Sequence, residues 1–575
     1  MAVAEPSGTA MASSPSAASG EQGRLAEAIS GVERRALWWL AALLAIDLVL
    51  LLYMGRHLTF YYDEWNFVES YGGGWHSLVE SHAGNIVFFP VIVYKILFHL
   101  AGLNHYVAFR LAVIVLHLIS GGLIFVLAAR RTSRVHALLA AALILFLGAA
   151  WEDLLWAFQV GYLLSVATGL AAWAAVERRD RRGDLVTMLC LIVSVGSSSL
   201  GLAVAAGLLV ELAWQRDWRR LWIIGVPAAL YALWYLGYGE SEVTSETLTH
   251  APGYVADLGA AAVGALAGRG LDWGRPLATA GVLLLVLRLL RPGPVSPRLA
   301  GLLTTAVGLW VITAAARSTV TSAETSRYVY LGAVAIVLIG VELLRGVSVS
   351  PRASALAAVL VGYAALTGLT QLQAGGTQLR SVSRLLTAEL GALELGSAYA
   401  GPTYRPDAYY APTLEAGPYL HAVHAIGSSP ASTLAQIAAS EAGVRGVVDA
   451  GLVKLEATLR PGAPAAGVTL TPPTPYAAIA GAVTRSGSCL RVVPTGSLLS
   501  VPLRLAAGAR LLVRSAPGPG VTVLARRFGD VTEPQHVGVV GGGQSGVVSF
   551  RPDVAGAYPW YVTLSAPQAT EVCSF

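Results

Sequence analysis

The chain has 575 residues, of which 55% are hydrophobic and only 13% are charged, whereas soluble proteins average about 25% charged residues. The mean hydropathy is +0.61, so composition excludes an ordinary soluble domain and predicts a protein with many membrane-spanning helices. The net charge of +5 comes from short basic runs between apolar segments, a pattern that reports membrane topology and argues against nucleic-acid binding.

Residues 1–35 are rich in Ala, Ser, Gly and Pro, and we predict a disordered cytoplasmic tail there. The tail ends at Arg34 and Arg35, directly before the first apolar run, residues 36–54. Because basic residues flanking a span stay on the cytoplasmic side, the N-terminus is predicted to be inside and the residues after 54 outside.

Following the basic loops in the same way gives about eleven crossings within residues 36–370, the predicted transmembrane domain. They are residues 36–54, 105–129, 136–150, 159–176, two within 185–213, 221–237, 276–290, 299–315, 329–344 and 353–370. A single span takes about 20 residues, so the 185–213 stretch, with Ser197–Ser199 and Gly201 near its middle, is predicted to form two short helices joined by a tight outer hairpin. Residues 85–101 and 253–268 are predicted to be interfacial or embedded helices.

After residue 370 the chain becomes more polar, and the topology places it outside the membrane. Residues 371–466 are predicted to be an extracytoplasmic helical and linker region. Residues 467–575 are predicted to form an extracytoplasmic β-sandwich, because short alternating runs are separated there by Gly and Pro. The predicted strands lie at 468–470, 490–493, 511–513, 521–524, 547–550 and 560–564.

Two of the three cysteines, Cys489 and Cys573, lie in the predicted β-sandwich, whereas Cys190 lies inside an apolar run. Disulfides persist outside the cytoplasm, so we predict that Cys489 and Cys573 are bonded. The alternative is a pair of free thiols.

Polar residues gather in three loops that the topology places on the outer face. Asp63 and Glu64 follow the first span between aromatic residues, and Glu152 and Asp153 lie between two tryptophans. Arg317 and the pair Arg327–Tyr328 flank a third loop, and His82 precedes the 85–101 segment. Charged groups at a membrane face are costly unless they are solvated, paired or used. The plain alternative is an interfacial aromatic belt with solvated acids.

Carboxylates and arginines beside a bilayer fit transfer from a lipid-linked donor. A carboxylate can take a proton from an acceptor hydroxyl, and arginines can bind the phosphate of the donor. The predicted roles are catalytic for Asp63 and Glu64, acceptor or second acidic site for Glu152, Asp153 and His82, and donor-phosphate binding for Arg317, Arg327 and Tyr328.

The run Asp63-Glu64-Trp65 in the first outer loop resembles the acidic motif of GT-C superfamily glycosyltransferases, which include protein O-mannosyltransferases and aminoarabinose transferases. The following segment with Pro90 and Tyr94, and the Ser326–Tyr328 entry into a late span, are also similar. The resemblance covers about residues 36–370. It implies a polyprenyl-phosphate-linked sugar donor, a cell-envelope glycan, lipid or protein acceptor, an extracytoplasmic site and inversion at the anomeric carbon. By position, Asp63 would be the general base and Glu64 its support. The run His82-Ala83-Gly84-Asn85 departs from the family pattern.

Two other functions stay open. A transporter or flippase of a lipid-linked envelope precursor would need polar residues and broken helices at mid-membrane, and only the 197–201 segment hints at such a break. A membrane-anchored carbohydrate-binding protein would have its active part in the tail. The sequence predicts no metal-ligand set, although a divalent metal is possible as a cofactor.

Overall fold

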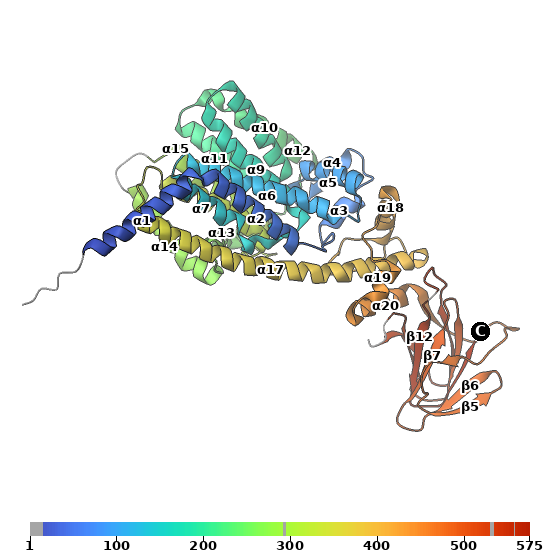
Figure 1. Ribbon diagram of the computed structural model, residues 1–575. Coiled ribbons are helices and arrows are strands. Elements are labelled where there is room, and N and C mark those ends of the chain that lie inside the picture. Colours follow the sequence, from blue (N-terminus) through green and yellow to red (C-terminus); the bar gives the residue numbers. More distant parts are fainter. Residues whose placement is uncertain (1–14, 291–294, 529–533, 557) are drawn as a thin grey trace, which may run out of the picture. The chain divides into compact units, whose positions relative to one another are not determined.

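The computed structural model describes residues 15–290, 295–528, 534–556 and 558–575 (Figure 1). The chain divides into two compact units, each considered by itself. The helical unit contains Met1–Arg56, Gly74–Val93 and Phe109–Thr377. The mixed unit contains His57–Gly73, Tyr94–Ala108 and Gln378–Phe575.

Nine helical segments of the described chain are long and apolar enough to cross a membrane. They are Ala36–Met54 (α2), Tyr106–Ala129 (α6), Arg134–Leu155, Ala157–Arg178, Trp218–Tyr238, Leu271–Leu290 (α14), Pro297–Arg317 (α15), Ser326–Leu343 (α16) and Pro351–Leu395 (α17). The three unlabelled segments contain α7 (Arg134–Leu145) with α8 (Trp151–Leu155), α9 (Val160–Ala175) and α12 (Trp222–Tyr238). Large side chains such as Trp38, Leu236 and Leu290 are exposed on them, as expected for surfaces that meet lipid. The predicted polytopic helical fold is confirmed.

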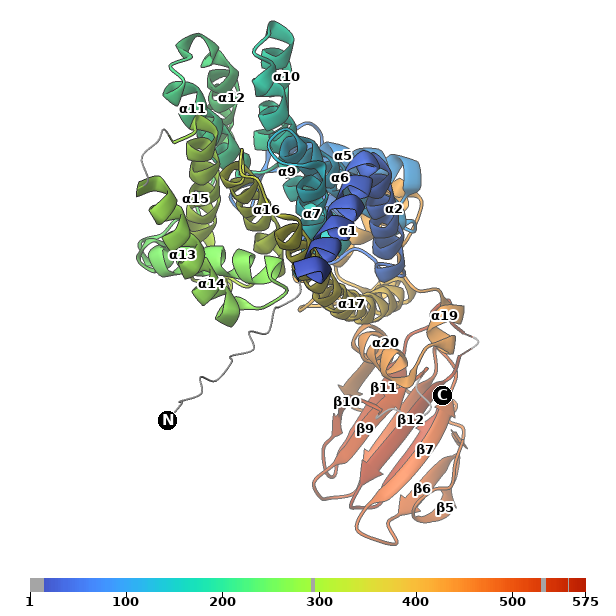
Figure 2. The ribbon, with the colours of Figure 1, turned by 60° about the vertical axis from the view of Figure 1, so that its left-hand side comes forward.

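The other two predicted crossings are short helices, as the sequence indicated. Helices α10 (Arg181–Ser197) and α11 (Gly201–Trp214) are joined by three residues, and Figure 2 shows them beside α12 in the helical unit. Helix α5 (Phe88–Ala101) is also short and apolar, as predicted for 85–101. Helix α13 (Ser245–Leu266) begins eight residues earlier than predicted, because the Thr244 side chain caps its first turn.

Two predicted boundaries are corrected. Residues 15–34 form helix α1 (Pro15–Arg34) instead of a disordered segment: Pro15 is compatible with the first turn, and Leu25, Ile29 and Val32 recur at helical spacing. The first fourteen residues of the predicted tail lie outside the described residues. Helix α17 is continuous for 45 residues, whereas the sequence predicted a span followed by a separate helix. Neither Gly375 nor Gly376 interrupts it.

An ion-pair network joins five helical segments of the helical unit. Arg131, after α6, pairs with Glu177 and, at 2.7 Å, with Glu342 in α16. Arg298 in α15 lies 2.9 Å from Glu177 and 3.0 Å from Glu211 in α11. All five residues belong to segments that the sequence places at the cytoplasmic ends of spans. Charges so close to lipid need partners, so loss of one member would leave an uncompensated charge between these helices.

A second set of polar contacts attaches α2 to α6 and α16, although few side chains of α2 are buried. Asp47 in α2 is 1% exposed, and its carboxylate lies 3.1 Å from Nε2 of the fully buried His117 in α6. His117 Nδ1 lies 2.8 Å from the Tyr330 hydroxyl in α16. These contacts connect three helices through groups that could not be left unpaired in hydrocarbon.

Close backbone packing fixes α17 within the helical unit. A Cβ atom added to Gly148, in the short helix η1 (Gly148–Ala150), would lie 1.7 Å from the carbonyl oxygen of Gly368. Only glycine therefore fits at Gly148 without moving α17.

In the mixed unit, short helices precede a β-domain. Its complete helices are α3 (Glu64–Glu69), α18 (Ala416–Ile426), α19 (Leu434–Ala439) and α20 (Ala442–Glu456). The strands form two antiparallel sheets with the orders β10-β9-β12-β7-β4 and β3-β11-β8-β13-β6-β5. Their bounds are β3 Ala457–Pro461, β4 Thr474–Pro475, β5 Ala482–Ser486, β6 Cys489–Val493, β7 Leu499–Leu505, β8 Arg510–Ser515, β9 Val521–Arg526, β10 Gln535–Val540, β11 Ser545–Phe550, β12 Trp560–Ala566 and β13 Thr570–Ser574.

The two sheets pack face to face, which confirms the predicted β-sandwich. Leu503 and Val562 from one sheet and Val513 and Val548 from the other belong to a single core and are fully buried. The domain begins at β3 rather than at residue 467, because β3 pairs with β11 as an added strand. The predicted strand at 468–470 is wrong: these residues form no strand, and the nearby Thr471 makes only an isolated bridge to Ser574.

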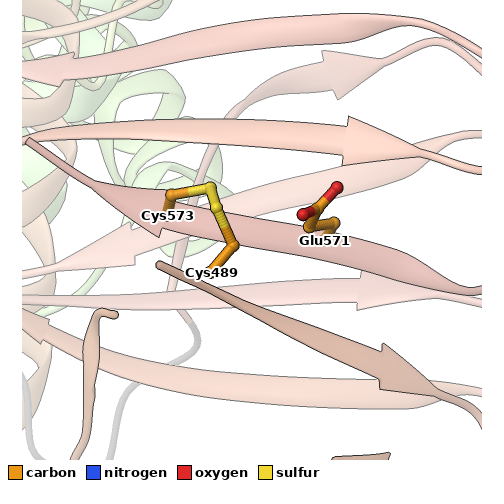
Figure 3. Close-up of side chains that lie close together, drawn as sticks. All are labelled: Cys489, Glu571 and Cys573. Atoms are coloured by element: carbon orange, nitrogen blue, oxygen red, sulfur yellow. A yellow bond between two sulfur atoms is a disulfide. The ribbon is translucent and has the colours of Figure 1, made fainter. Parts of the chain in front are cut away.

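Cys489 and Cys573 form the predicted disulfide, shown in Figure 3. They are cross-strand neighbours at the end of the β6–β13 pair, and their Cα atoms are 4.5 Å apart. That distance is typical of directly opposed residues that do not exchange backbone hydrogen bonds. The bond ties the last strand of the sandwich to a strand 84 residues earlier.

A buried arginine with two acids closes one end of the sandwich. Arg527 is fully buried, and its guanidinium lies 3.2 Å from Glu456 and donates to Asp553 at 2.7 Å. Burial, together with the negative charge of Asp553, raises the pKa of Glu456 to about 8. The Glu456 side chain is therefore mostly protonated at neutral pH.

Candidate functional site

Glu64 anchors the acidic loop of the mixed unit. Its side chain is fully buried, and its carboxylate accepts hydrogen bonds from the Tyr94 hydroxyl at 2.5 Å, the Tyr106 hydroxyl at 2.9 Å and the Tyr61 backbone N–H at 2.9 Å. The ring of Phe60 packs edge-on against Tyr106. A buried carboxylate with three donors is well satisfied, so Glu64 fixes the loop that carries its neighbour Asp63.

Asp63 lies at the start of α3 and is partly exposed, unlike Glu64. The residue before it, Tyr62, has φ +51°, a left-handed conformation that is unfavourable for a side chain of this size. The Tyr62 N–H donates to the carbonyl of Tyr410 at 2.9 Å, which holds that conformation in place. Asp63 is thus held between a strained residue and a buried one, an arrangement common where a side chain must be aimed.

A tyrosine cluster, Tyr61, Tyr62, Tyr409 and Tyr410, surrounds this loop within the mixed unit. The ring centroids of Tyr61 and Tyr62 are 5.8 Å apart, those of Tyr61 and Tyr410 6.4 Å, and those of Tyr409 and Tyr410 4.7 Å. The Asp407 carboxylate accepts hydrogen bonds from the N–H groups of Tyr409 and Tyr410, at 2.6 and 2.7 Å, which shapes their turn. Tyr409 is 76% exposed. The cluster offers aromatic faces and hydroxyls to a polar ligand.

In the helical unit, Glu152 connects the second acidic turn to the start of α16. Its carboxylate accepts a hydrogen bond from the Arg327 N–H at 3.1 Å, and its own N–H donates to the Ser326 hydroxyl at 3.0 Å. The Ser326 hydroxyl in turn donates to the Ala149 carbonyl at 2.7 Å. A carboxylate at a helix N-terminus is favourable, so Glu152 positions Arg327.

Asp153 has a different environment from its neighbour. It is fully buried in α8, and neither carboxylate oxygen has a hydrogen-bond partner among the described residues. The charges that act on it most strongly are those of Glu152 and Arg327. A buried acid without hydrogen-bond donors is costly, and a ligand bearing hydroxyl groups would supply them.

Aromatic rings link Arg327 to His82. The Arg327 guanidinium lies 5.9 Å from the Trp156 ring, which stacks on Phe158 at a centroid distance of 5.0 Å. The His82 ring lies 5.5 Å from that of Phe158. The predicted residues Glu152, Asp153, His82 and Arg327 therefore occupy one region, named here the arginine site.

The other two predicted phosphate ligands have structural contacts. Arg317 pairs with Glu242 at 2.5 Å and donates to the Ala83 carbonyl at 3.1 Å, so it holds the hairpin of β1 (Ser81–His82) and β2 (Asn85–Ile86). Tyr328 is buried beside Leu258 and Ala323, with the Arg327 guanidinium 5.8 Å from its ring. Their phosphate-binding roles stay predictions. Asp63 and Glu64 belong to the mixed unit and the arginine site to the helical unit.

Among the described residues, one group has the composition of a metal site: Cys489, Glu571 and Cys573. Figure 3 shows the two sulfur atoms bonded to each other, so they are not thiolate ligands, and Glu571 pairs with Arg514 at 3.2 Å. The residues present do not fit a metal in this state. A divalent-metal cofactor elsewhere stays a prediction.

Sequence reasoning missed the residues that hold the acids in place. Tyr94 and Tyr106 follow Glu64 by 30 and 42 residues, and no local pattern marks them as its partners. The stacked pair Trp156 and Phe158 was visible as aromatics beside the second acidic turn. Polar residues inside apolar helices, such as Asp47, are the sequence signal for buried polar contacts between helices.

No protein-family model matches the chain, and no curated protein matches it. The solved structures to which the chain is similar include two of ArnT from Cupriavidus metallidurans. One, bound to undecaprenyl phosphate, has 17% sequence identity and a TM-score of 0.42, and covers 63% of this chain and 81% of its own. The apo structure has 16% identity and the same TM-score, and covers 64% of this chain and 81% of its own.

Proposed function

We propose that this protein is a membrane glycosyltransferase of the GT-C type, which moves a sugar from a polyprenyl-phosphate donor to a cell-envelope acceptor on the extracytoplasmic face. The observation that carries the proposal is the contrast between two adjacent acids. Glu64 is buried and held by three hydrogen bonds, and it presents a partly exposed Asp63 at a strained turn. The buried acid holds the loop and leaves its partly exposed neighbour in a defined position, which suits a general base that must be placed beside an acceptor hydroxyl.

In the proposed reaction, Asp63 takes the proton from the acceptor hydroxyl as its oxygen attacks the anomeric carbon. The bond between that carbon and the phosphate oxygen breaks, and the polyprenyl phosphate leaves with the electron pair. A single displacement inverts the anomeric carbon. The lipid phosphate is already a good leaving group, so positioning and charge stabilisation supply most of the catalysis.

The arginine site suits the donor. Arg327 carries a planar, permanently charged group next to stacked aromatic rings, and it is positioned by Glu152. The Asp153 carboxylate, which lacks hydrogen-bond donors among the described residues, would accept hydrogen bonds from sugar hydroxyls. The tyrosine cluster would contact the acceptor.

Asp63→Asn tests the base. It keeps the shape of the side chain and removes its basicity, so transfer should fall by about 10²–10⁴-fold while the protein folds normally. In a deletion strain complemented with this variant, the polyprenyl-phosphate sugar should accumulate and a surface glycan should be missing.

Glu441→Gln is the matched control, because Glu441 is an exposed acid of the same unit whose partner, Arg384, is also exposed. It should restore transfer fully. Turnover near that of the wild type in Asp63→Asn would end the assignment of Asp63 and favour a transporter.

Sidedness needs a separate test. The basic loops predict a cytoplasmic N-terminus and an extracytoplasmic tail. A reporter that is active only outside the cytoplasm, fused after Gly396 at the end of α17, should be active. Activity of a cytoplasmic reporter at the same point would reverse the assignment.

A further inference from the structure

Residues 400–415, named here the connecting segment, are attached to the acidic loop and to α3 within the mixed unit. The carbonyl of Tyr410 accepts the Tyr62 N–H at 2.9 Å, and the Glu415 N–H donates to Glu69 Oε1 at 2.8 Å. Helix α18, which follows the connecting segment, packs against α3 (Figure 1). The conformation of the acidic loop therefore depends on that of the connecting segment.

Asp407 determines the conformation of the connecting segment where it meets Tyr62. Its side chain is 7% exposed, and its Oδ1 atom accepts the N–H groups of Tyr409 and Tyr410 at 2.6 and 2.7 Å. An aspartate that bonds to the backbone two and three residues later fixes the direction of the chain through that turn. Tyr410 then presents its carbonyl to the Tyr62 N–H. Asp407 is thus connected, through Tyr410, to the residue directly before Asp63.

The Asp407 carboxylate also has an acidic neighbour. Glu389, in the part of α17 that belongs to the mixed unit, is hydrogen-bonded to Asp407 through their side chains. A hydrogen bond between two carboxyl groups needs a proton on one of them, because ionised carboxylates only accept. Asp407 accepts two N–H groups, as a carboxylate does, so Glu389 is the member that supplies the proton.

The surroundings of Glu389 favour its neutral form. Its Oε2 atom is buried, and no donor of the described residues bonds to that atom. The charge that acts on Glu389 most strongly is that of Asp407, which opposes a second negative charge, whereas the charge of Lys454 on α20 acts in the opposite direction. Lys454 is exposed and therefore screened by solvent. Tyr404 also interacts with Glu389, and a tyrosine hydroxyl is neutral at pH 7.

We propose that Glu389 and Asp407 are positioning residues for the general base: the proton of Glu389 keeps Asp407 in its turn, and that turn holds Tyr62 and thereby Asp63. This positioning role rests on the proposed function, in which Asp63 takes the proton of the acceptor hydroxyl. Loss of the Glu389 proton would place two negative charges side by side and drive Asp407 out of the turn. Transfer would then fall reversibly at alkaline pH, although Asp63 stays ionised there.

The first test is the pH dependence of transfer. Membranes of the deletion strain complemented with each variant supply donor and acceptor, and consumption of the polyprenyl-phosphate sugar is followed between about pH 7 and 10. Buried glutamates can keep their proton up to about pH 8–9, and a displacement of about 1 Å can cost about 100-fold in rate. The wild type should therefore lose up to about 100-fold at the alkaline end of this range.

Glu389→Gln carries a permanent amide donor for Asp407 and cannot ionise. It should match the wild type at pH 7 and keep its activity where the wild type loses activity. A merely structural role of Glu389 would not move the alkaline limb in this way. Glu441→Gln is the matched control, because it removes an exposed acid from the same unit, and it should lose activity together with the wild type.

Hydrogen–deuterium exchange tests the turn without any substrate. The full-length protein is measured in neutral lipid nanodiscs at pH 7. In Asp407→Ala, two N–H groups lose their acceptor, so peptides from residues 400–415 and 57–73 should exchange about tenfold faster, the effect of losing one hydrogen bond. Asp407→Asn keeps an oxygen for both N–H groups and an amide that can bond to Glu389, so it should exchange as the wild type does.

Two results would overturn the proposal. One is the same alkaline loss of transfer in Glu389→Gln and in the wild type, which would show that the Glu389 proton does not position the base. The other is unchanged exchange of residues 57–73 in Asp407→Ala, which would show that the turn does not hold the acidic loop. Failure of the proposed function has a separate signature, normal transfer by Asp63→Asn, and the exchange experiment does not depend on it.

Discussion

Removal of the Glu64 carboxylate should destabilise the protein strongly, because two buried hydroxyls and one partly buried N–H depend on it. Glu64→Ala leaves the hydroxyls of Tyr94 and Tyr106 and the N–H of Tyr61 without their acceptor. Each unsatisfied buried group costs about 1–3 kcal/mol, so the free energy of unfolding should fall by at least about 3 kcal/mol. Glu64→Gln keeps one oxygen for Tyr106 and Tyr61, and its amide can donate to the Tyr94 hydroxyl, so its cost should be nearer 1 kcal/mol.

The measurement is the melting temperature of the full-length protein in detergent, followed by tryptophan fluorescence. A loss of 3 kcal/mol corresponds to a shift of roughly 6–12 °C for a domain of 150–250 residues and to a smaller shift for a longer chain. Glu441→Ala is the control; its acid pairs with Arg384 at an exposed site, and surface pairs contribute about 0–1 kcal/mol.

A double-mutant cycle makes this prediction specific. Tyr94→Phe removes one of the donors, so its effect should not add to that of Glu64→Ala, and a coupling above about 1 kcal/mol is expected for groups in contact. Melting of Glu64→Ala at the wild-type temperature would show that the carboxylate is dispensable. Additive effects would show that the Tyr94–Glu64 bond contributes nothing.

Three further predictions follow from other parts of the molecule. Arg327→Lys keeps the charge but loses the planar fork, so it should raise the donor concentration needed for half-maximal transfer; unchanged donor dependence would leave Arg327 as an interfacial anchor. The folded-state pKa of Glu456, about 8, lies above its unfolded value near 4.5, so this group's stabilisation is complete below pH 4.5 and is lost as pH rises to about 8. The melting temperature should therefore depend less on pH between pH 5 and 8 in Glu456→Gln than in the wild type. An equal pH dependence of the melting temperature in the two proteins would contradict the assignment. Serine at both Cys489 and Cys573 should destabilise the sandwich by about 2–5 kcal/mol, and labelling of both cysteines by a thiol reagent in the untreated protein would refute the bond.

Hydropathy predicted the helical unit well because the backbone in a membrane must satisfy its own hydrogen bonds, which leaves helices as the solution for long apolar runs. Residues 15–34 were misjudged because a composition rich in small and polar residues resembles that of a disordered segment. The helical spacing of Leu25, Ile29 and Val32 was the overlooked signal.

Strand prediction succeeded where apolar residues alternate on a half-buried strand. β9 and β12 show this clearly, since every second residue of each is buried. β5 was missed because all five of its residues are exposed, and β7 because Pro502 interrupts its run. Pairing partners, not local sequence, decide whether such segments become strands.

For the candidate site, sequence located the acids but could not tell them apart. Asp63 and Glu64 are adjacent and chemically alike, and only the fold shows that Glu64 is buried while Asp63 is partly exposed. The difference arises from tyrosines tens of residues away, so it is invisible to any short pattern. Arg317 and Arg327 looked equivalent for the same reason, yet Arg317 is paired with Glu242.

The ion-pair network also has a consequence for synthesis, because its members are added to the growing chain at different times. Glu177 precedes its partner Arg298 by 121 residues, so at about 5–20 residues per second it is synthesised roughly 6–24 s earlier. Arg131 lies 46 residues before Glu177 and can pair with it much sooner, whereas Glu342 arrives 211 residues after Arg131. Early helices must therefore carry incompletely matched charges at the membrane until α15 and α16 are inserted. Chains that stall before Arg298 would leave Glu177 and Glu211 without this partner, so unfinished copies would differ from complete ones in the charge held at the membrane.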